Sequence, residues 1–177
     1  MFLSREFYYT RIKAQLANII TLMNLSFGII AIIFILEGLG HISLVFILLA
    51  AIFDRYDGMV ARHFNTESAF GKELDSLCDL VSFGIAPALL IYVTVFSEML
   101  WIGVLVTVFY ILAGAIRLAR YNVSEFNGVF CGVPITVAGV ILALSYFIYP
   151  YMKDGFYLIL MLVLTYLMVS SMRITKI

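Results

Sequence analysis

The sequence is poor in charge. Its 177 residues contain eleven Lys and Arg and eleven Asp and Glu, so only 12% are charged, against about a quarter in soluble globular domains. So little charge with so much hydrophobicity excludes an intrinsically disordered chain. The formal net charge is zero and no basic run occurs, which argues against nucleic acid as a partner.

Cysteine and histidine are also scarce, with two of each. Cys78 and Cys131 do not make a disulfide framework, and both fall near the side assigned below to the cytoplasm, where thiols stay reduced. We expect both to be small apolar packing residues. We expect His41 and His63 to be interfacial residues rather than metal ligands.

Long uncharged runs are what the sequence has in abundance, and 64% of its residues are hydrophobic. A helix that crosses a bilayer needs about 20 largely apolar residues. Six uncharged stretches therefore predict six transmembrane helices, and the shortness of the second implies that its helix continues into the charged segment 54–62. We expect an all-α integral membrane protein, a single six-helix bundle over residues 1–177. The stretches are residues 14–36, 38–53, 80–97, 99–116, 126–152 and 155–172.

The basic residues predict the orientation of the bundle. With the N-terminus in the cytoplasm, every Lys and Arg except Lys153 falls on the inner side, as the positive-inside rule requires. Six spans then place the C-terminus in the cytoplasm too. No small-residue cleavage site follows the first apolar run, so we expect that run to stay in the membrane. Residues 2–13 mix aromatic and basic residues, which is typical of a helix lying on the inner surface.

Acidic residues cluster at a depth where the membrane makes them costly. Asp54 and Asp57 are three residues apart, hence about 60° apart on a helix, and Asp75 and Asp79 are four apart, hence about 40° apart. Two helices joined by a short loop can thus direct two carboxylates each at one point. Such acids usually mark a functional site that faces the bundle interior.

Four converging carboxylates would repel one another unless cations neutralised them. Two divalent cations would balance their charge, and hard oxygen ligands suit Mg²⁺, Mn²⁺ or Ca²⁺ rather than zinc. Gly58 and Ala61 continue the face of Asp54 and Asp57, and their small size lets a ligand or a second helix approach closely.

The spacing of these residues resembles a family signature. From Asp54 to Asp79 the sequence reads D-x2-D-G-x2-A-R-x8-G-x3-D-x3-D, and every fixed position matches that of the CDP-alcohol phosphotransferase family. This family has six transmembrane helices, so the resemblance spans essentially the whole chain. Softer motifs resemble its integral-membrane phosphatidylserine synthase branch, and these lie in residues 17–25, 70–88, 117–122 and 130–139.

The resemblance implies an activity and a set of site residues. The activity is transfer of a phosphatidyl group from CDP-diacylglycerol to the hydroxyl of L-serine, giving phosphatidylserine and CMP. One metal would bind Asp54, Asp57 and Asp75, and a second would bind Asp54, Asp75 and Asp79, with Asp79 as general base. The implied nucleotide-binding residues are Asp57, Gly58, Ala61, Arg62 and Gly71. The resemblance also implies a homodimer. We expect the protein to lie in the plasma membrane, in contact with membrane lipids, with its active site facing the cytoplasm.

Three arginines each have two interpretations. Arg117 and Arg120 are three residues apart and share one helix face. We hypothesise that at least one of them holds the serine carboxylate or a lipid phosphate, while the alternative is that both only set the topology. Arg62 could pair with a phosphate through its planar fork or merely anchor the helix at the inner surface.

Other functions explain parts of the sequence. A sister enzyme that uses glycerol 3-phosphate, inositol phosphate or an archaeal lipid acceptor would share the Asp signature. A divalent-metal transporter would use the acids as an ion site, but they lie at cytoplasmic helix ends and the outer half holds no matching acids. A non-catalytic membrane scaffold leaves the signature unexplained.

Overall fold

The computed structural model describes residues 2–63, 68–123, 130–170 and 173–174. These residues are almost entirely helical, and the exceptions are short turns and two strands of two residues each, β1 (Phe130–Cys131) and β2 (Arg173–Ile174), which pair antiparallel. The predicted all-α class is confirmed, with this one short strand pair as an addition.

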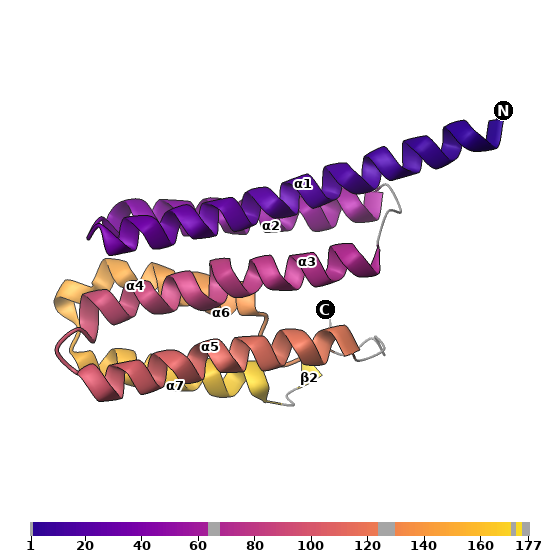
Figure 1. Cartoon of the computed structure of the whole chain (residues 1–177). Coiled ribbons are helices and arrows are strands. Elements are labelled where there is room, and N and C mark those ends of the chain that lie inside the picture. Colours follow the sequence, from indigo (N-terminus) through magenta and orange to yellow (C-terminus); the bar gives the residue numbers. More distant parts are fainter. Residues whose placement is uncertain (1, 64–67, 124–129, 171–172, 175–177) are drawn as a thin grey trace.

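The helices of the described residues lie side by side in a bundle of rods (Figure 1). Two of the rods are composite, because α3 continues through the π-helical segment η1 into α4, and α6 continues into the 3₁₀ segment η2. The bounds are α1 (Phe2–Leu36), α2 (Gly40–His63), α3 (Ala69–Asp79), η1 (Leu80–Ile85), α4 (Ala86–Val95), α5 (Leu100–Val123), α6 (Ile135–Ser145), η2 (Tyr146–Tyr151) and α7 (Asp154–Val169).

Consecutive rods run in opposite directions, so their connections alternate between the two ends of the bundle (Figure 1). The α1–α2, α4–α5 and η2–α7 turns lie at one end, where Gly38 in the first turn has a φ of 73°. The start of α1 and strand β2 lie toward the other end. We call the half of the bundle with Asp54, Asp57, Asp75 and Asp79 the carboxylate half, and the half with His41, Tyr146, Tyr149 and Tyr157 the aromatic half.

Three stretches of the described helices are long and apolar enough to cross a membrane: Asn18–Leu36, Ala69–Val95 and Trp101–Val123. The second of these contains α3, η1 and α4 as one continuous rod. Helix α2 carries four charged residues in its second half, and Ile135–Tyr151 and Asp154–Val169 are shorter apolar helices. Helices that can span a membrane are thus confirmed, while the six-span topology and the orientation of the termini stay predictions.

The structure adds detail to two predicted segments. Residues 2–13 are helical, but they continue α1 without a break, and this part of α1 extends beyond the rest of the bundle (Figure 1). Within the uncharged stretch 126–152 the helix begins at Ile135, after Pro134 and after Gly132, which turns the chain with a φ of 77°. The predicted continuation of the second helix through residues 54–62 is confirmed.

The π-helical segment η1 is packed between α1 and α6 at positions where only glycine fits. A Cβ added to Gly28 of α1 would overlap the Ser82 side chain, and one added to Gly139 of α6 would lie 2.5 Å from the Phe83 carbonyl oxygen. Ser82 Oγ also donates to the Asn24 carbonyl at 3.2 Å. Because η1 follows Asp79 directly, this packing fixes the end of α3 that carries the carboxylates.

Candidate active site

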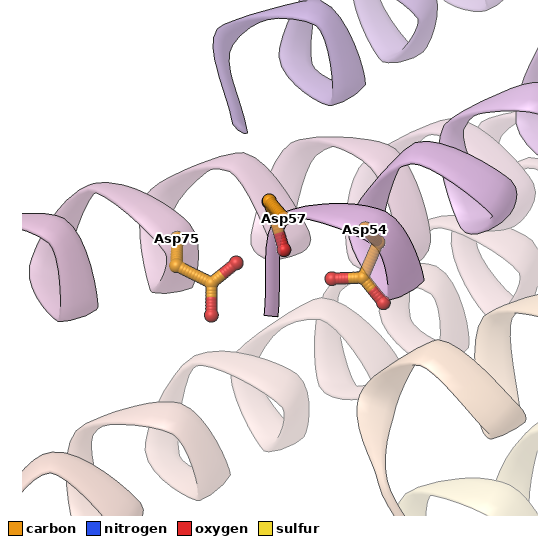
Figure 2. Close-up of side chains that lie close together, drawn as sticks. All are labelled: Asp54, Asp57 and Asp75. Atoms are coloured by element: carbon orange, nitrogen blue, oxygen red, sulfur yellow. The ribbon is translucent and has the colours of Figure 1, made fainter. Parts of the chain in front are cut away.

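Three predicted carboxylates meet between two helices. Asp54 and Asp57 come from α2 and Asp75 from α3, and one carboxylate oxygen from each lies within 4.8 Å of the others. Figure 2 shows the three side chains beside one another. Asp57 is buried, whereas Asp54 and Asp75 are half-buried. The helical phase predicted from the spacing therefore does place carboxylates of both helices at one point.

The oxygens of this cluster have the features of ligands for a hard cation. Among the described residues, Asp57 Oδ2 and Asp75 Oδ1 are buried and have no hydrogen-bond partner. An unpaired buried carboxylate oxygen is costly, and a divalent cation would remove that cost. The donor set is carboxylate oxygen without thiolate or imidazole, which fits Mg²⁺, Mn²⁺ or Ca²⁺.

Asp79 lies beside the cluster and is joined to it through Asp54. Its side chain is 8% exposed and is hydrogen-bonded to that of Asp54. From α1, Asn24 Nδ2 donates to Asp79 Oδ1 at 3.4 Å. The fourth carboxylate of the signature is thus adjacent to the other three and, like Asp57, buried.

Sequence reasoning gave no role to three polar residues that contact the carboxylates. Thr21 and Asn24 of α1 hydrogen-bond to Asp57 and Asp79, and Thr136 Oγ1 of α6 donates to Asp54 at 3.5 Å. Thr21 and Asn24 are buried. All three belong to motifs noted in the resemblance, and a useful signal was that Thr21 and Asn24 are polar residues three apart in an uncharged run, with Asn18 three residues before Thr21.

The predicted nucleotide-binding residues follow the carboxylates along α2 and α3. Gly58 is half-buried next to Asp57. Gly71 lies in the first turn of α3, where its N–H donates to Ser68 Oγ at 3.0 Å, and a Cβ there would lie 3.3 Å from Asn18 Oδ1. Ala61 and Arg62 are on α2, but their side chains lie outside the described residues. Their roles stay predictions.

The two arginines of α5 have different surroundings. Arg117 is half-buried, its guanidinium interacts electrostatically with Asp79, and its buried Nε has no partner in the part of the chain that the structure describes. Arg120 is exposed, and its Nη1 donates to the Val169 carbonyl at the end of α7 at 2.9 Å. One helix face thus supplies one arginine to the carboxylates and one to helix packing.

The described cysteine and histidine side chains have packing roles and are not members of the carboxylate cluster. Cys78 is fully buried as a free thiol, in line with a packing role. The His41 ring packs against Tyr146 with ring centroids 5.1 Å apart, in the aromatic half. The side chains of His63 and Cys131 lie outside the described residues.

Comparison with known proteins supports the resemblance over nearly the whole chain. The sequence profile described as CDP-alcohol phosphatidyltransferase matches residues 14–172. This stretch includes all the carboxylates, both arginines of α5 and the polar residues of α1 that contact the site.

Individual relatives are similar over comparable lengths. Archaetidylserine synthase of Methanothermobacter thermautotrophicus is 34% identical over 165 residues, which cover 92% of this chain and 70% of the relative. The CDP-diacylglycerol–serine O-phosphatidyltransferase of Methanocaldococcus jannaschii is 37% identical over 163 residues (91% and 74%), and that of Bacillus subtilis is 37% identical over 131 residues (73% and 74%). With the Asp signature folded into one cluster, the chain belongs to the CDP-alcohol phosphatidyltransferase family of phosphotransferases.

Proposed function

We propose that this protein transfers the phosphatidyl group of CDP-diacylglycerol to the hydroxyl of L-serine, giving phosphatidylserine and CMP. The observation that carries the proposal is the cluster of Asp54, Asp57 and Asp75, whose unpaired buried oxygens suit a divalent cation. The choice of serine is supported by the relatives, because serine is common to the names of all three described above. A transporter function has no comparable support.

Two divalent cations, Mg²⁺ or Mn²⁺, would bind at this cluster. Asp54, Asp57 and Asp75 would hold one cation, and Asp54, Asp75 and Asp79 the other. When bound, such cations neutralise the pyrophosphate and stabilise the entering and leaving oxygens of an in-line displacement.

Asp79 is suited to act as the general base. Its carboxylate would accept the proton of the serine hydroxyl as the serine oxygen forms a bond to the lipid-bearing phosphorus. The bond from that phosphorus to the oxygen shared with the cytidylate phosphate breaks, and CMP leaves with the electron pair. The contact from Asn24 would keep the Asp79 carboxylate oriented for this transfer.

The serine carboxylate needs a cationic partner, and Arg117 is better placed for it than Arg120. Arg117 is close enough to Asp79 to interact with it electrostatically and has an unpaired Nε, whereas Arg120 is already bonded to the Val169 carbonyl. A guanidinium binds a carboxylate through two parallel hydrogen bonds, which would fix the acceptor relative to the base. A lipid phosphate would use the same chemistry.

The cytidine nucleotide would lie against Asp57, Gly58, Ala61, Arg62 and Gly71. Small residues there let a ligand approach the backbone, and Arg62 would pair with a phosphate. We further propose that residues 1–177 form one domain that crosses the plasma membrane six times, with both termini and the site on the cytoplasmic side, and that the protein is a homodimer.

The test is an acceptor panel with the purified protein in detergent. CDP-diacylglycerol and Mg²⁺ or Mn²⁺ are supplied, L-serine, glycerol 3-phosphate or inositol phosphate is added in turn, and CMP is measured. Release that depends on serine supports the proposal. Release only with another acceptor would make this a sister enzyme, and no release with any acceptor would reject the activity. Replacing the donor by an archaeal CDP-lipid tests the lipid half of the substrate.

A further inference from the structure

Next to the carboxylates, a polar link joins α3 to the last turn of α5. Asn122 Nδ2 donates to Ser76 Oγ at 3.0 Å, and Ser76 Oγ is 3.1 Å from the Lys72 carbonyl that it can donate to. Lys72 Nζ donates to the carbonyls of Tyr121 and Asn122 at 3.4 and 3.3 Å, and lies 5.0 Å from the centre of the Tyr121 ring. We call Lys72, Ser76 and Asn122 the α3–α5 link.

The link is built from interactions that fix the end of a helix. The last carbonyls of α5 have no partner within the helix, and a lysine charge near them is favourable. The Ser76–Asn122 hydrogen bond is half-buried, so it is screened less than the exposed lysine contacts. Together these contacts fix the position of α5 along its axis and its rotation about that axis, relative to α3.

The position of the link relates it to Arg117. Ser76 directly follows Asp75 on α3, and Asn122 comes five residues, or about one and a half turns, after Arg117 on α5. None of the link residues belongs to the carboxylate cluster, whose members come from α2 and α3. Arg117 is a long side chain on a separate rod, so its distance from Asp79 depends on how α5 is held.

We infer that the α3–α5 link positions Arg117 for the acceptor, which makes Ser76 and Asn122 positioning residues for serine. This inference rests on the proposed function. A displacement of about 1 Å can cost up to about 10² in rate when a group must orient a substrate. Loss of the link therefore acts on the acceptor rather than on the CDP-lipid, whose cation ligands do not lie on α5.

The experiment is a double-mutant cycle with full steady-state kinetics. Ser76→Ala, Asn122→Ala and the double variant are each assayed for the KM of serine, the KM of CDP-diacylglycerol and kcat. Ser76→Thr keeps the hydroxyl and serves as the conservative rescue. Thr94→Val is the matched control, because Thr94 Oγ1 donates at 2.6 Å to Leu90 within its own helix. Thermal unfolding in detergent is measured for every variant.

We expect each alanine variant to raise the KM of serine about tenfold, with the KM of CDP-diacylglycerol within about twofold of wild type. The double variant should cost no more than either single one, because both remove the same hydrogen bond. Ser76→Thr should restore the wild-type value. Additive effects, an equal rise in both KM values, or a fall in unfolding temperature without a change for serine would overturn the inference. If the wild-type protein released no CMP in response to serine, the proposed function itself would be rejected.

Discussion

The two halves of the bundle treat their buried polar groups differently. In the aromatic half, Tyr157 OH donates to the Ser145 carbonyl at 2.8 Å and Ser145 Oγ to the Leu142 carbonyl at 2.6 Å. In the carboxylate half, the buried atoms Asn24 Oδ1, Asp57 Oδ2, Asp75 Oδ1 and Arg117 Nε have no partner among the described residues. In the part of the chain that the structure describes, the other such atoms are two neutral hydroxyls, those of Thr107 and of Ser43, which lies near His41 in the aromatic half.

The difference indicates what each half is selected for. A satisfied buried group stabilises the fold, whereas an unsatisfied one costs stability unless a ligand completes it. The carboxylate half therefore gives up stability in exchange for binding, and the aromatic half holds the rods together. Substitutions in the carboxylate half should therefore lower activity, and those in the aromatic half should lower stability. The largest effects are expected in the carboxylate half.

The largest effect is expected from the cation ligands. Asp57→Asn and Asp75→Asn should each lower turnover by about 10³ or more, because a divalent cation contributes several kcal/mol to transition-state stabilisation. Removing divalent cations with a chelator should abolish CMP release, and adding Mg²⁺ or Mn²⁺ should restore it. Glu73→Gln, an exposed acid on the same helix as Asp75, is the control and should behave like wild type.

A stability measurement makes this test independent of turnover. Cation binding to the folded state raises its unfolding temperature. Wild type should show this shift and Asp57→Asn should not. Wild-type activity or an intact shift in both Asp variants would mean that the cluster holds no cation.

Asp79→Asn should lower turnover by a factor of about 10² or more, because it removes the base while keeping the shape of the side chain. Single-turnover CMP release with saturating serine measures the chemical step directly. Near-normal turnover in this variant would remove Asp79 from the mechanism.

Arg117→Ala and Arg120→Ala should differ from each other. Loss of Arg117 should raise the KM of serine about tenfold or more, as expected for a charge-assisted hydrogen bond. Loss of Arg120 should leave that KM within about twofold but lower the unfolding temperature, because Arg120 bonds to the Val169 carbonyl. If neither variant changed the kinetics with serine, the assignment of an arginine to the acceptor would be wrong.

The smallest effect is expected in the aromatic half. Tyr157→Phe removes the bond to Ser145 and should lower the free energy of unfolding by about 1 kcal/mol, with unchanged kinetics. Tyr166→Phe on the same helix, where the side chain is 67% exposed, should change neither. Loss of activity in Tyr157→Phe would contradict the conclusion that the aromatic half contributes to stability and not to activity.

Much of the site could be predicted because it is local in sequence. Asp54 with Asp57, and Asp75 with Asp79, are set on one helix face by spacing alone, and the structure brings carboxylates from both helices together. The contribution of Thr21 and Asn24 could not be derived in this way, since it depends on how α1 packs against α2 and α3. Arg117 and Arg120 were equivalent by spacing, and only their neighbours in other rods distinguish them.

Fold boundaries show the same limit. The uncharged stretches predicted where the apolar helices lie. The ends of the helices depend instead on local features, such as the Ser68 side chain that caps α3 and Pro134 before α6. Uncharged residues 130–134 therefore precede a helix instead of forming it.

The π-helical segment η1 makes the type of helix between Asp79 and α4 a determinant of the direction in which Asp75 and Asp79 point. The Ala86 N–H bonds to the Val81 carbonyl five residues back, where an α-helix would use the residue four back. If the same six residues, Leu80–Ile85, were regular α-helix, they would rotate further, and Asp75 and Asp79 would be turned by about 100° relative to α4. The π-helical turn thus sets the rotation of α3 relative to α4. At one end the rod presents apolar side chains to its neighbours, and at the other end it presents Asp75 and Asp79 to the carboxylate cluster.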